Sequence, residues 1–340
     1  MLSRVADSIF WMSRYIERAE NVARFTDVNW HLILDSASGQ DEQWQALLNT
    51  TGDHEGFAKR YGKAGRENVI QFVTFDTANP NSIISCLRFA RENARTSRDV
   101  ISTEMWEQIN SFYLMMKDAA AGKQVMEAPY EFFKQVRIAS QLFVGISDAT
   151  MSHGEGWNFC RVGRFLERTD KTSRILDVKY YLLRPPEAGG GALVDDIQWA
   201  AVLNAASALE MYRKRHRRIA PEKVVEFLML DPEFPRAVLY CVKNAESALL
   251  NIIGEPRGAY NCLPAEQLGE LYSELSKAEI QNIIITGLHE YVDALQTKLN
   301  GIGEAVHETF FSMEKAPVMQ SQSQSQSTGQ TQSQSQTPPV

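Results

Sequence analysis

The sequence lacks the spacings that mark the common metal, redox and nucleotide sites. Its four cysteines lie far apart and none forms a CxxC pair, which excludes a zinc ribbon or a thioredoxin-like site. There is no Walker A, HExxH or GxSxG motif, and no GxGxxG follows an expected strand. A single ExxH, Glu304 to His307, lacks the second copy and the further glutamates of a di-iron bundle. The sequence therefore predicts no metal and no cofactor.

Long apolar runs are also absent. No stretch approaches about 18 uninterrupted apolar residues, and the N-terminal segment has no clean apolar core or small-residue cleavage site. We therefore expect a cytoplasmic protein without a signal peptide and without a membrane partner. Cys86 and Cys241 lie in apolar helical patterns and are expected to be buried free thiols, as in a reducing compartment. The formal net charge of -7 disfavours nucleic acid as a partner.

Apolar residues recur at helical spacing along most of the chain, which predicts an all-α fold. A helix is also favoured over a strand at residues 68–75, because the neighbouring segments are helical. Segment 184–194 has two prolines and three glycines and is the clearest linker. The other expected helices span residues 3–35, 42–49, 82–101, 104–120, 130–150, 156–183, 197–216, 224–230, 236–253, 265–275, 277–299 and 302–312. Asn81 and Ser102 are the expected caps of two of them.

The strongest signal in the chain is an internal repeat. The segment RYIERAE, from Arg14, matches RFLERTD, from Arg164, 150 positions later. The segment ending in NPNSIISC at Cys86 matches the one ending in FPRAVLYC at Cys241, 155 positions later. Because chance similarity would not keep register over so many elements, we predict a tandem duplication packed about a pseudo-twofold axis. Residues 1–314 then form one helical domain, with repeat one at about 1–150 and repeat two at about 151–314. The Ser/Gln-rich tail, 315–340, is expected to be disordered.

Charged residues occupy fixed places on the first long helix. On a helical wheel Glu20, Arg24 and Asp27 lie beside the apolar stripe, whereas Arg14 and Arg18 lie nearly opposite it. Arg24 is spaced to pair with Glu20 on one side and with Asp27 on the other. The second long helix repeats these charges 150 positions later.

The repeated charges allow two interpretations. They can be salt-bridge ladders that lock the two long helices together, since an unpaired buried charge is costly. Alternatively they line a shared polar cavity, in which Glu17 and Glu167 would be acid/base or ligand-binding groups. The sequence alone does not decide between them.

A cluster of arginines occurs only in the first half of the chain. The matching stretch of the second half, KNAESALL, is mostly neutral. Clustered arginines suit the recognition of carboxylates or phosphates, although a solvated or salt-bridged face is the alternative. The cluster consists of Arg88, Arg91, Glu92, Asn93, Arg95 and Arg98. A second basic segment, Arg213–Arg218, is interpreted either as a polyanion-binding surface or as a flexible loop.

Taken together, several blocks resemble the bacterial alpha-E domain family, a family of unknown function. The resemblance covers about residues 1–314 and rests on MLSRVADSIFWMSRYIERAENVAR, NPNSIISCLRFARENARTSRDVIS, GWNFCRVGRFLERTDKTSRILDV and VVEFLMLDPEFPRAVLYC. It implies an all-α bacterial protein of the cytoplasm. It also implies partners, because family members are encoded beside, or fused to, a circularly permuted ATP-grasp protein and a transglutaminase-like protein. One departure is Ala237, where the family pattern leads us to expect serine.

The resemblance leaves two functional hypotheses. In the first, the chain is a non-catalytic or co-catalytic partner of an ATP-grasp amide ligase in a peptide-modifying system. The arginine cluster, with Arg14 and Arg164, would then bind an acidic peptide, a phosphate-containing intermediate or the ligase itself. In the second, the chain is a peptide- or amide-acting enzyme that uses Glu17 and Glu167 as acid/base groups.

Overall fold

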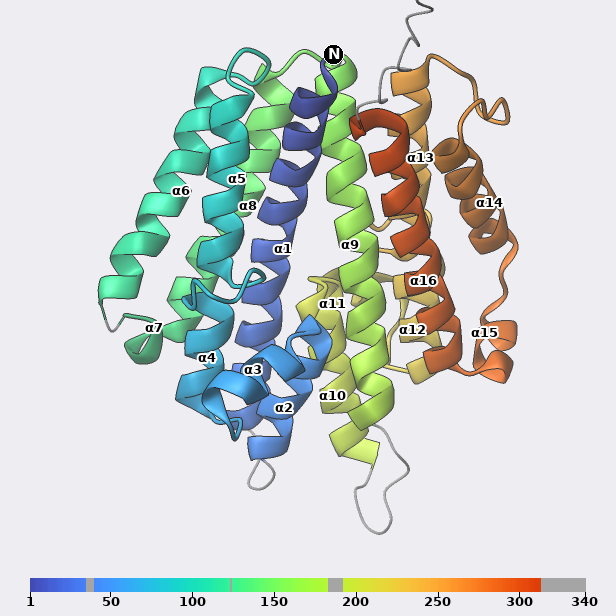
Figure 1. The fold of residues 1–340 in the computed structure, drawn as a ribbon. Coiled ribbons are helices and arrows are strands. Elements are labelled where there is room, and N and C mark those ends of the chain that lie inside the picture. The colour runs from blue at the N-terminus through green and yellow to red at the C-terminus, as the bar shows by residue number, and fades with distance from the viewer. Residues whose placement is uncertain (35–39, 123, 183–191, 313–340) are drawn as a thin grey trace, which may run out of the picture.

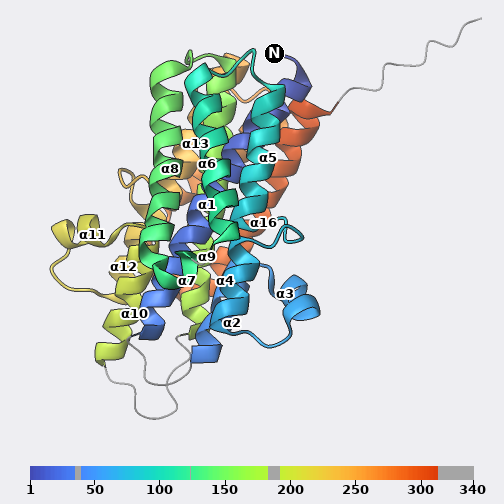
Figure 2. The same ribbon diagram turned by 90° about the vertical axis from the view of Figure 1, so that its left-hand side faces the viewer.

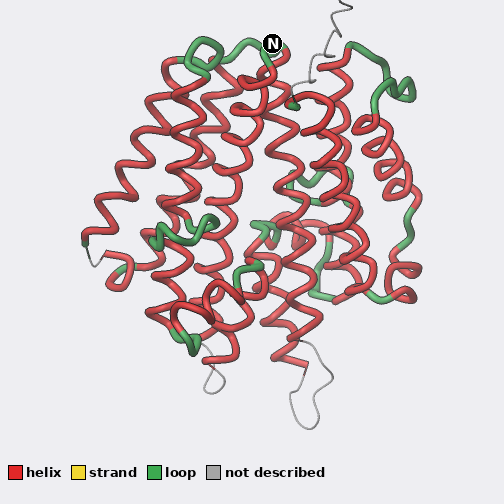
Figure 3. The backbone as a smooth tube through the Cα atoms, viewed as in Figure 1, coloured by secondary structure: helices red, strands yellow, loops and turns green. Residues whose placement is uncertain are grey.

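The computed structural model describes residues 1–34, 40–122, 124–182 and 192–312, and every regular element in these ranges is helical (Figures 1 and 3). This confirms the predicted all-α fold, including a helix in place of a strand at residues 68–75. The helices are α1 (Ser3–Leu34), α2 (Gln40–Thr51), α3 (His54–Tyr61), α4 (Arg66–Thr74), α5 (Ile83–Thr96), α6 (Thr103–Ala121), α7 (Gln124–Glu127), α8 (Pro129–Thr150), α9 (Glu155–Leu182), α10 (Ala192–Ala205), α11 (Leu209–Arg215), α12 (Pro221–Leu230), α13 (Val238–Ile253), α14 (Leu263–Lys277), α15 (Ile280–Thr286), α16 (Leu288–Val306) and the π-helical turn η1 (His307–Phe311).

Two long parallel helices, α1 and α9, form the centre of the molecule (Figure 1). On one side α5 and α8 pack against α1, and α6 packs against both of them. On the other side α13 and α16 pack against α9, and α14 packs against both of these. Figure 2, turned by 90°, shows that the shorter helices α2, α3, α10 and α11 lie toward the end of the long helices opposite the N-terminus. The molecule is therefore two groups of four long helices that share the α1–α9 contact.

Serine side chains cap the starts of α5 and α6. The hydroxyl of Ser102 accepts a hydrogen bond from the Met105 amide at the start of α6, as predicted. The cap of α5 is Ser82 rather than the predicted Asn81, and Ser82 accepts from the Ser85 amide. Helix α5 ends at Thr96, five residues before the predicted end. Ala237, which replaces the expected serine at the equivalent place in α13, makes no capping bond.

Several predicted helix boundaries in the second half are wrong. The expected helix at 197–216 is broken by a turn at Ser207 into α10 and α11. The expected helix at 277–299 is broken at 278–279 and again at Gly287, whose φ is +99°. Helix α16 then continues past 299 to Val306, so residues 288–306 are one element. In the first half, the polar, glycine-rich segment 52–65, for which the sequence favours a loop or a frayed helix, contains the short helix α3.

Matching contacts recur at a separation of 155 residues. The Gly52 amide donates to the Asn49 carbonyl, and the Ser207 amide donates to the Asn204 carbonyl. Similarly, the guanidinium of Arg60 binds Asp76, and that of Arg215 binds Asp231. The thiols of Cys86 and Cys241 contact the carbonyls of Pro80 and Pro235. These contacts are what the predicted duplication requires. The duplication itself, with its pseudo-twofold axis and repeat boundaries, stays a prediction.

The core is continuous across both groups of helices. Its buried side chains include Cys86 and Cys241, as predicted, and also Cys160. None of the described helices is long and apolar enough to span a bilayer. Of the predicted linker, residues 184–191 lie outside the described residues, whereas 192–194 begin α10. The predicted disordered tail also lies outside them.

Candidate functional site

The two Glu-Arg dipeptides of the long helices bind each other. Glu17 on α1 accepts hydrogen bonds from Nε and Nη2 of Arg168 on α9, at 2.9 and 2.7 Å. Glu167 on α9 accepts hydrogen bonds from Nε and Nη2 of Arg18 on α1, at 2.7 and 3.1 Å. Each guanidinium therefore binds its carboxylate in the strong bidentate geometry. Because the helices run parallel, the same two residues of each helix meet at the same level.

Both carboxylates are removed from water and nevertheless remain charged. Glu17 is 2% exposed and Glu167 is 0% exposed. Burial by itself would raise the pKa of Glu17, but Arg168 and Arg236 hold it far below its usual range. Burial would likewise raise the pKa of Glu167, but Arg18 and Lys171 hold it well below the usual range. Neither carboxyl can therefore carry a proton near neutral pH.

Each carboxylate has a further cation, and its source differs between the halves. Lys171 Nζ lies 3.5 Å from Glu167 and comes from α9 itself. Arg236 donates to Glu17 at 3.1 Å and to Glu20 at 2.6 Å, and it comes from the loop before α13. Both additional cations therefore come from the second half of the chain, Lys171 from a helix and Arg236 from a loop.

Amides occupy the complementary positions. Asn21, at the place equivalent to Lys171, donates to Glu17 at 3.0 Å. Asn81, at the place equivalent to Arg236, accepts from Nη1 of Arg18 at 2.8 Å. The sequence did not identify Arg236 as a member of the site, and it indicated Asn81 only as a helix cap. The signal that could have identified them is that, 155 positions apart in the predicted repeat, one position holds an amide and the other a charge.

The predicted charge ladders are partly confirmed. Arg24 binds Glu20, and Arg174 binds Asp170, as the i,i+4 spacing predicted. Asp27, however, binds Arg137 of α8, and the spacing of charges along α1 could not indicate a partner on another helix. Arg14 and Arg18, predicted to lie opposite the apolar stripe, both reach Glu167, with Arg14 Nε at 2.9 Å. The wheel misplaced them because α1 is packed on three sides, by α5, α8 and α9.

The network holds more cations than carboxylates. Between the levels of Arg14 and Arg24 on α1, and at the equivalent levels of α9, eight cations surround four carboxylates. The cations are Arg14, Arg18, Arg24, Arg164, Arg168, Lys171, Arg174 and Arg236, and the carboxylates are Glu17, Glu20, Glu167 and Asp170. Buried excess charge is costly, so this region favours the approach of an anion.

Arg164 is the member of this set that has no carboxylate partner among the described residues. Its guanidinium lies 4.9 Å from the ring centroid of Phe165, and its Nε is buried without a hydrogen bond. Burial lowers the pKa of Arg164 to about 10. A cavity of about 10 Å³ borders it, together with Ser13 and Glu17. That volume is about one water molecule, so no organic substrate fits beside Glu17 here.

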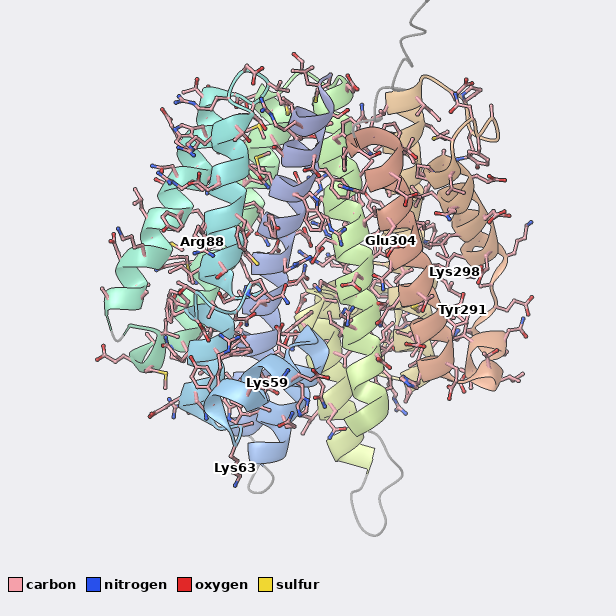
Figure 4. All side chains as sticks on the ribbon, viewed as in Figure 1. Lys59, Lys63, Arg88, Tyr291, Lys298 and Glu304 are labelled. Atoms are coloured by element: carbon pink, nitrogen blue, oxygen red, sulfur yellow. The ribbon has the colours of Figure 1, made fainter. Side chains whose placement is uncertain are left out.

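The arginine cluster lies elsewhere, on α5 (Figure 4, Arg88) and, for Arg98, in the turn that follows it. Arg91 is half-buried, and its Nε donates to Asn110 on α6 at 2.8 Å. Arg98 lies over the Trp106 ring at 5.0 Å, and Arg95 pairs with Glu92 at 2.9 Å. The structure therefore does not bring the predicted cluster together with Glu17 and Glu167.

Two arginines of the cluster face outward without an ion-pair partner among the described residues. Arg88 and Arg98 are exposed and have no acidic partner among the described residues. Asn93, the remaining member, accepts from Thr96 and Ser97 through its backbone carbonyl. In the basic segment Arg213–Arg218, Arg215 binds Asp231 and Glu233, and the remaining basic side chains are exposed except for half-buried His216. The ranges that the structure describes contain no group of three or more metal-ligating side chains.

Comparison with known proteins adds a family. The Alpha-E model, described as a predicted alpha-helical domain with a conserved ER motif, matches residues 1–311. The Glu-Arg dipeptides of the chain are those at 17–18 and 167–168. Uncharacterised proteins of Mycobacterium bovis and Mycobacterium tuberculosis are 21% identical over 332 residues. These matches cover 90% of this chain and 36% of each relative, so the chain spans about a third of their length. No solved structure matches it.

Proposed function

The chain belongs to the Alpha-E family, and on that premise we propose that it is an accessory subunit of a peptide-modifying system built on an ATP-grasp amide ligase. In this proposal it binds a partner or an anionic group and does not itself carry out the reaction. One contrast carries the proposal. The carboxylates of the Glu-Arg dipeptides are buried in ion pairs, whereas Arg88 on α5 and Arg98 just after it are exposed and have no acidic partner among the described residues.

An acid/base role for Glu17 and Glu167 has little support. A general acid or base needs contact with its substrate and a pKa near the working pH. Each of these carboxylates is saturated by arginines, and their pKa values are lowered. We therefore assign them to the contact between α1 and α9, and we do not propose them as catalytic residues.

The arginine face of α5 suits an acidic partner. Arg88 and Arg98 are exposed, and the equivalent positions in α13 hold Lys243 and the half-buried Ile253. At the position equivalent to Arg91, Glu246 is fully buried and pairs with Arg257 at 2.7 Å. An unneutralised patch of arginines on a chain of net charge -7 favours association with a negatively charged surface.

The length of the relatives supports an accessory role as well. In the mycobacterial proteins the matched region is 36% of the chain, so there it is covalently joined to further sequence. A helical domain that occurs within longer chains is suited to work beside other domains. The ATP-grasp and transglutaminase-like identities of the partners come from the family resemblance.

Copurification tests this function. The full chain should retain the ATP-grasp protein encoded beside it, and an Arg88→Glu/Arg98→Glu variant should retain at least about tenfold less. The matched control is Lys223→Glu/Lys243→Glu, which reverses two exposed charges of the second half, one of them at the place equivalent to Arg88. If the wild-type chain retains no ATP-grasp protein, the accessory role is excluded. If both variants bind equally, the partner does not contact α5.

A further inference from the structure

A groove of about 580 Å³ lies where the first and second halves of the chain meet. Helices α1 and α8 line one side of it, and α10, α11 and the turn between them line the other (Figure 2). Its walls include the apolar side chains of Val28, Ile197 and Leu209. The volume is in the range of sites that hold small organic ligands.

Two arginines are the basic residues of the groove, whose polar lining also includes Asp27, Tyr130, Asn204, Ser207 and Glu210. Arg24 is 3% exposed, and it donates through Nε to Glu20 at 2.9 Å and through Nη1 to the hydroxyl of Ser207. Arg137 donates through one nitrogen to Asp27, and its other N–H groups have no partner among the described residues. Each arginine therefore has one carboxylate neighbour and still has donors to offer.

Ser207 has an unusual backbone for a serine. Its φ is +50°, and it is the only non-glycine residue with positive φ in the described ranges. Gly52, at the equivalent position of the first half, has φ +76° and fits this conformation without strain. A strained residue in place of glycine indicates a use for its side chain. The hydroxyl of Ser207 lines the groove and contacts Arg24.

We propose that this groove binds the C-terminal end of a short peptide, with the carboxylate held by Arg24, Arg137 and Ser207. The apolar walls then contact the side chains that precede the carboxylate. A singly charged group fits better than a phosphate dianion, because Glu20 and Asp27 already neutralise part of the arginine charge. That the ligand carries a carboxylate follows from the residues of the groove alone. That this carboxylate belongs to a peptide rests on the proposed function.

The first test is calorimetric titration of the full chain with the tripeptide Ala-Leu-Leu and with its C-terminal amide. The free acid should bind at least about tenfold more tightly, because the amide cannot accept charge-assisted hydrogen bonds from both arginines. Equal binding of acid and amide, or no binding of the acid at millimolar concentration, overturns the proposal. Inorganic phosphate that binds as tightly as the acid also overturns it, in favour of a simple anion site.

The second test separates a ligand role of Ser207 from a structural one. Ser207→Gly removes the hydroxyl and relieves the strained φ, so the melting temperature should stay the same or rise while the affinity for Ala-Leu-Leu falls about tenfold. Gly52→Ser, the converse change at the matched position, should leave this affinity unchanged. Unchanged affinity in Ser207→Gly excludes the groove. Neither titration contains an ATP-grasp protein, so a negative copurification does not contradict carboxylate binding in the groove. Likewise, a negative titration does not contradict partner binding at the α5 surface.

Discussion

Glu17 illustrates how a fully buried carboxylate can stabilise a helical core. It is contacted by Arg168, Arg236 and Asn21, so its removal leaves the buried Arg168 without a carboxylate partner and Arg236 with Glu20 alone. We expect Glu17→Gln to lower the free energy of unfolding by about 3–5 kcal/mol, measured by urea denaturation. The control is Glu92→Gln, which breaks exposed pairs on α5 and should cost about 1 kcal/mol or less. Equal losses in the two variants would show that the buried ion pairs of Glu17 contribute no more to stability than exposed ion pairs do.

The same carboxylates determine the response to acid. A carboxyl group whose pKa is lower in the folded state than in the unfolded state stabilises the folded state at pH values above the unfolded-state pKa. This stabilisation is lost as the pH falls through the unfolded-state pKa toward the folded-state pKa. For Glu17 and Glu167 the loss should begin near the ordinary pKa of 4.5 and continue below it. The free energy of unfolding should therefore fall below that pH, and it should fall less steeply in Glu167→Gln than in the wild type. Parallel pH profiles for the two proteins would contradict this.

The thiols should differ sharply in reactivity. Burial raises the pKa values of Cys86 and Cys241 to about 12 and that of Cys160 to about 11, whereas Cys262 is partly exposed. Because the thiolate is the reactive form, a thiol reagent at mildly alkaline pH should label one cysteine per native chain and four after denaturation. Peptide mapping should identify Cys262. Labelling of Cys86 in the native protein would show that the core opens there.

At this scale the sequence identified the charged residues but not their partners. Helical spacing correctly paired Glu20 with Arg24 and Asp170 with Arg174, because those contacts are local. It could not pair Glu17 with Arg168, since that contact depends on how two helices 150 positions apart pack. The one-sided wheel also misplaced Arg14 and Arg18, whose long side chains reach the neighbouring helix.

Helices α1 and α9 are in close backbone contact at Gly163. A Cβ atom there would lie 2.4 Å from the carbonyl oxygen of Phe10. Because this oxygen belongs to the backbone, it can move away only if the helix itself shifts. Gly163→Ala should therefore destabilise the protein by about 1–3 kcal/mol, measured by urea denaturation. In Gly145→Ala, the Cβ meets nothing within 4 Å and lies within a helix, so a gain of about 0.5–1 kcal/mol is expected. A neutral Gly163→Ala would show that the two helices can separate without cost.

The number and order of elements were largely predictable, whereas some breaks were not. Amphipathic spacing defined the long helices, and Ser102 marked the start of α6, because those signals are local. The turn at Ser207 has no glycine or proline to mark it, and the contact of its hydroxyl with Arg24 joins residues 183 positions apart. Gly287 was available as a signal, but the apolar pattern on both sides of it favoured one continuous helix.

The whole molecule should unfold as one unit. Its core is continuous, and each of the two central helices packs against both groups of helices, so neither group can keep its interior after the other is lost. We expect one urea transition, with coincident changes in far-UV circular dichroism and tryptophan fluorescence. Buried tryptophans report on both halves, through Trp44 and Trp199. Two resolved transitions would show that the halves are independent folding units.

The dipeptide shared by α1 and α9 also constrains how the sequence can change over generations. Glu-Arg is its own complement when two such helices run side by side, since each glutamate meets the arginine of the other copy. Inverting the order to Arg-Glu in one copy would set like charges against each other twice, and only a simultaneous inversion in the other copy would restore both pairs. The residues at positions 17–18 and 167–168 are therefore expected to co-vary during evolution, although 150 positions separate them.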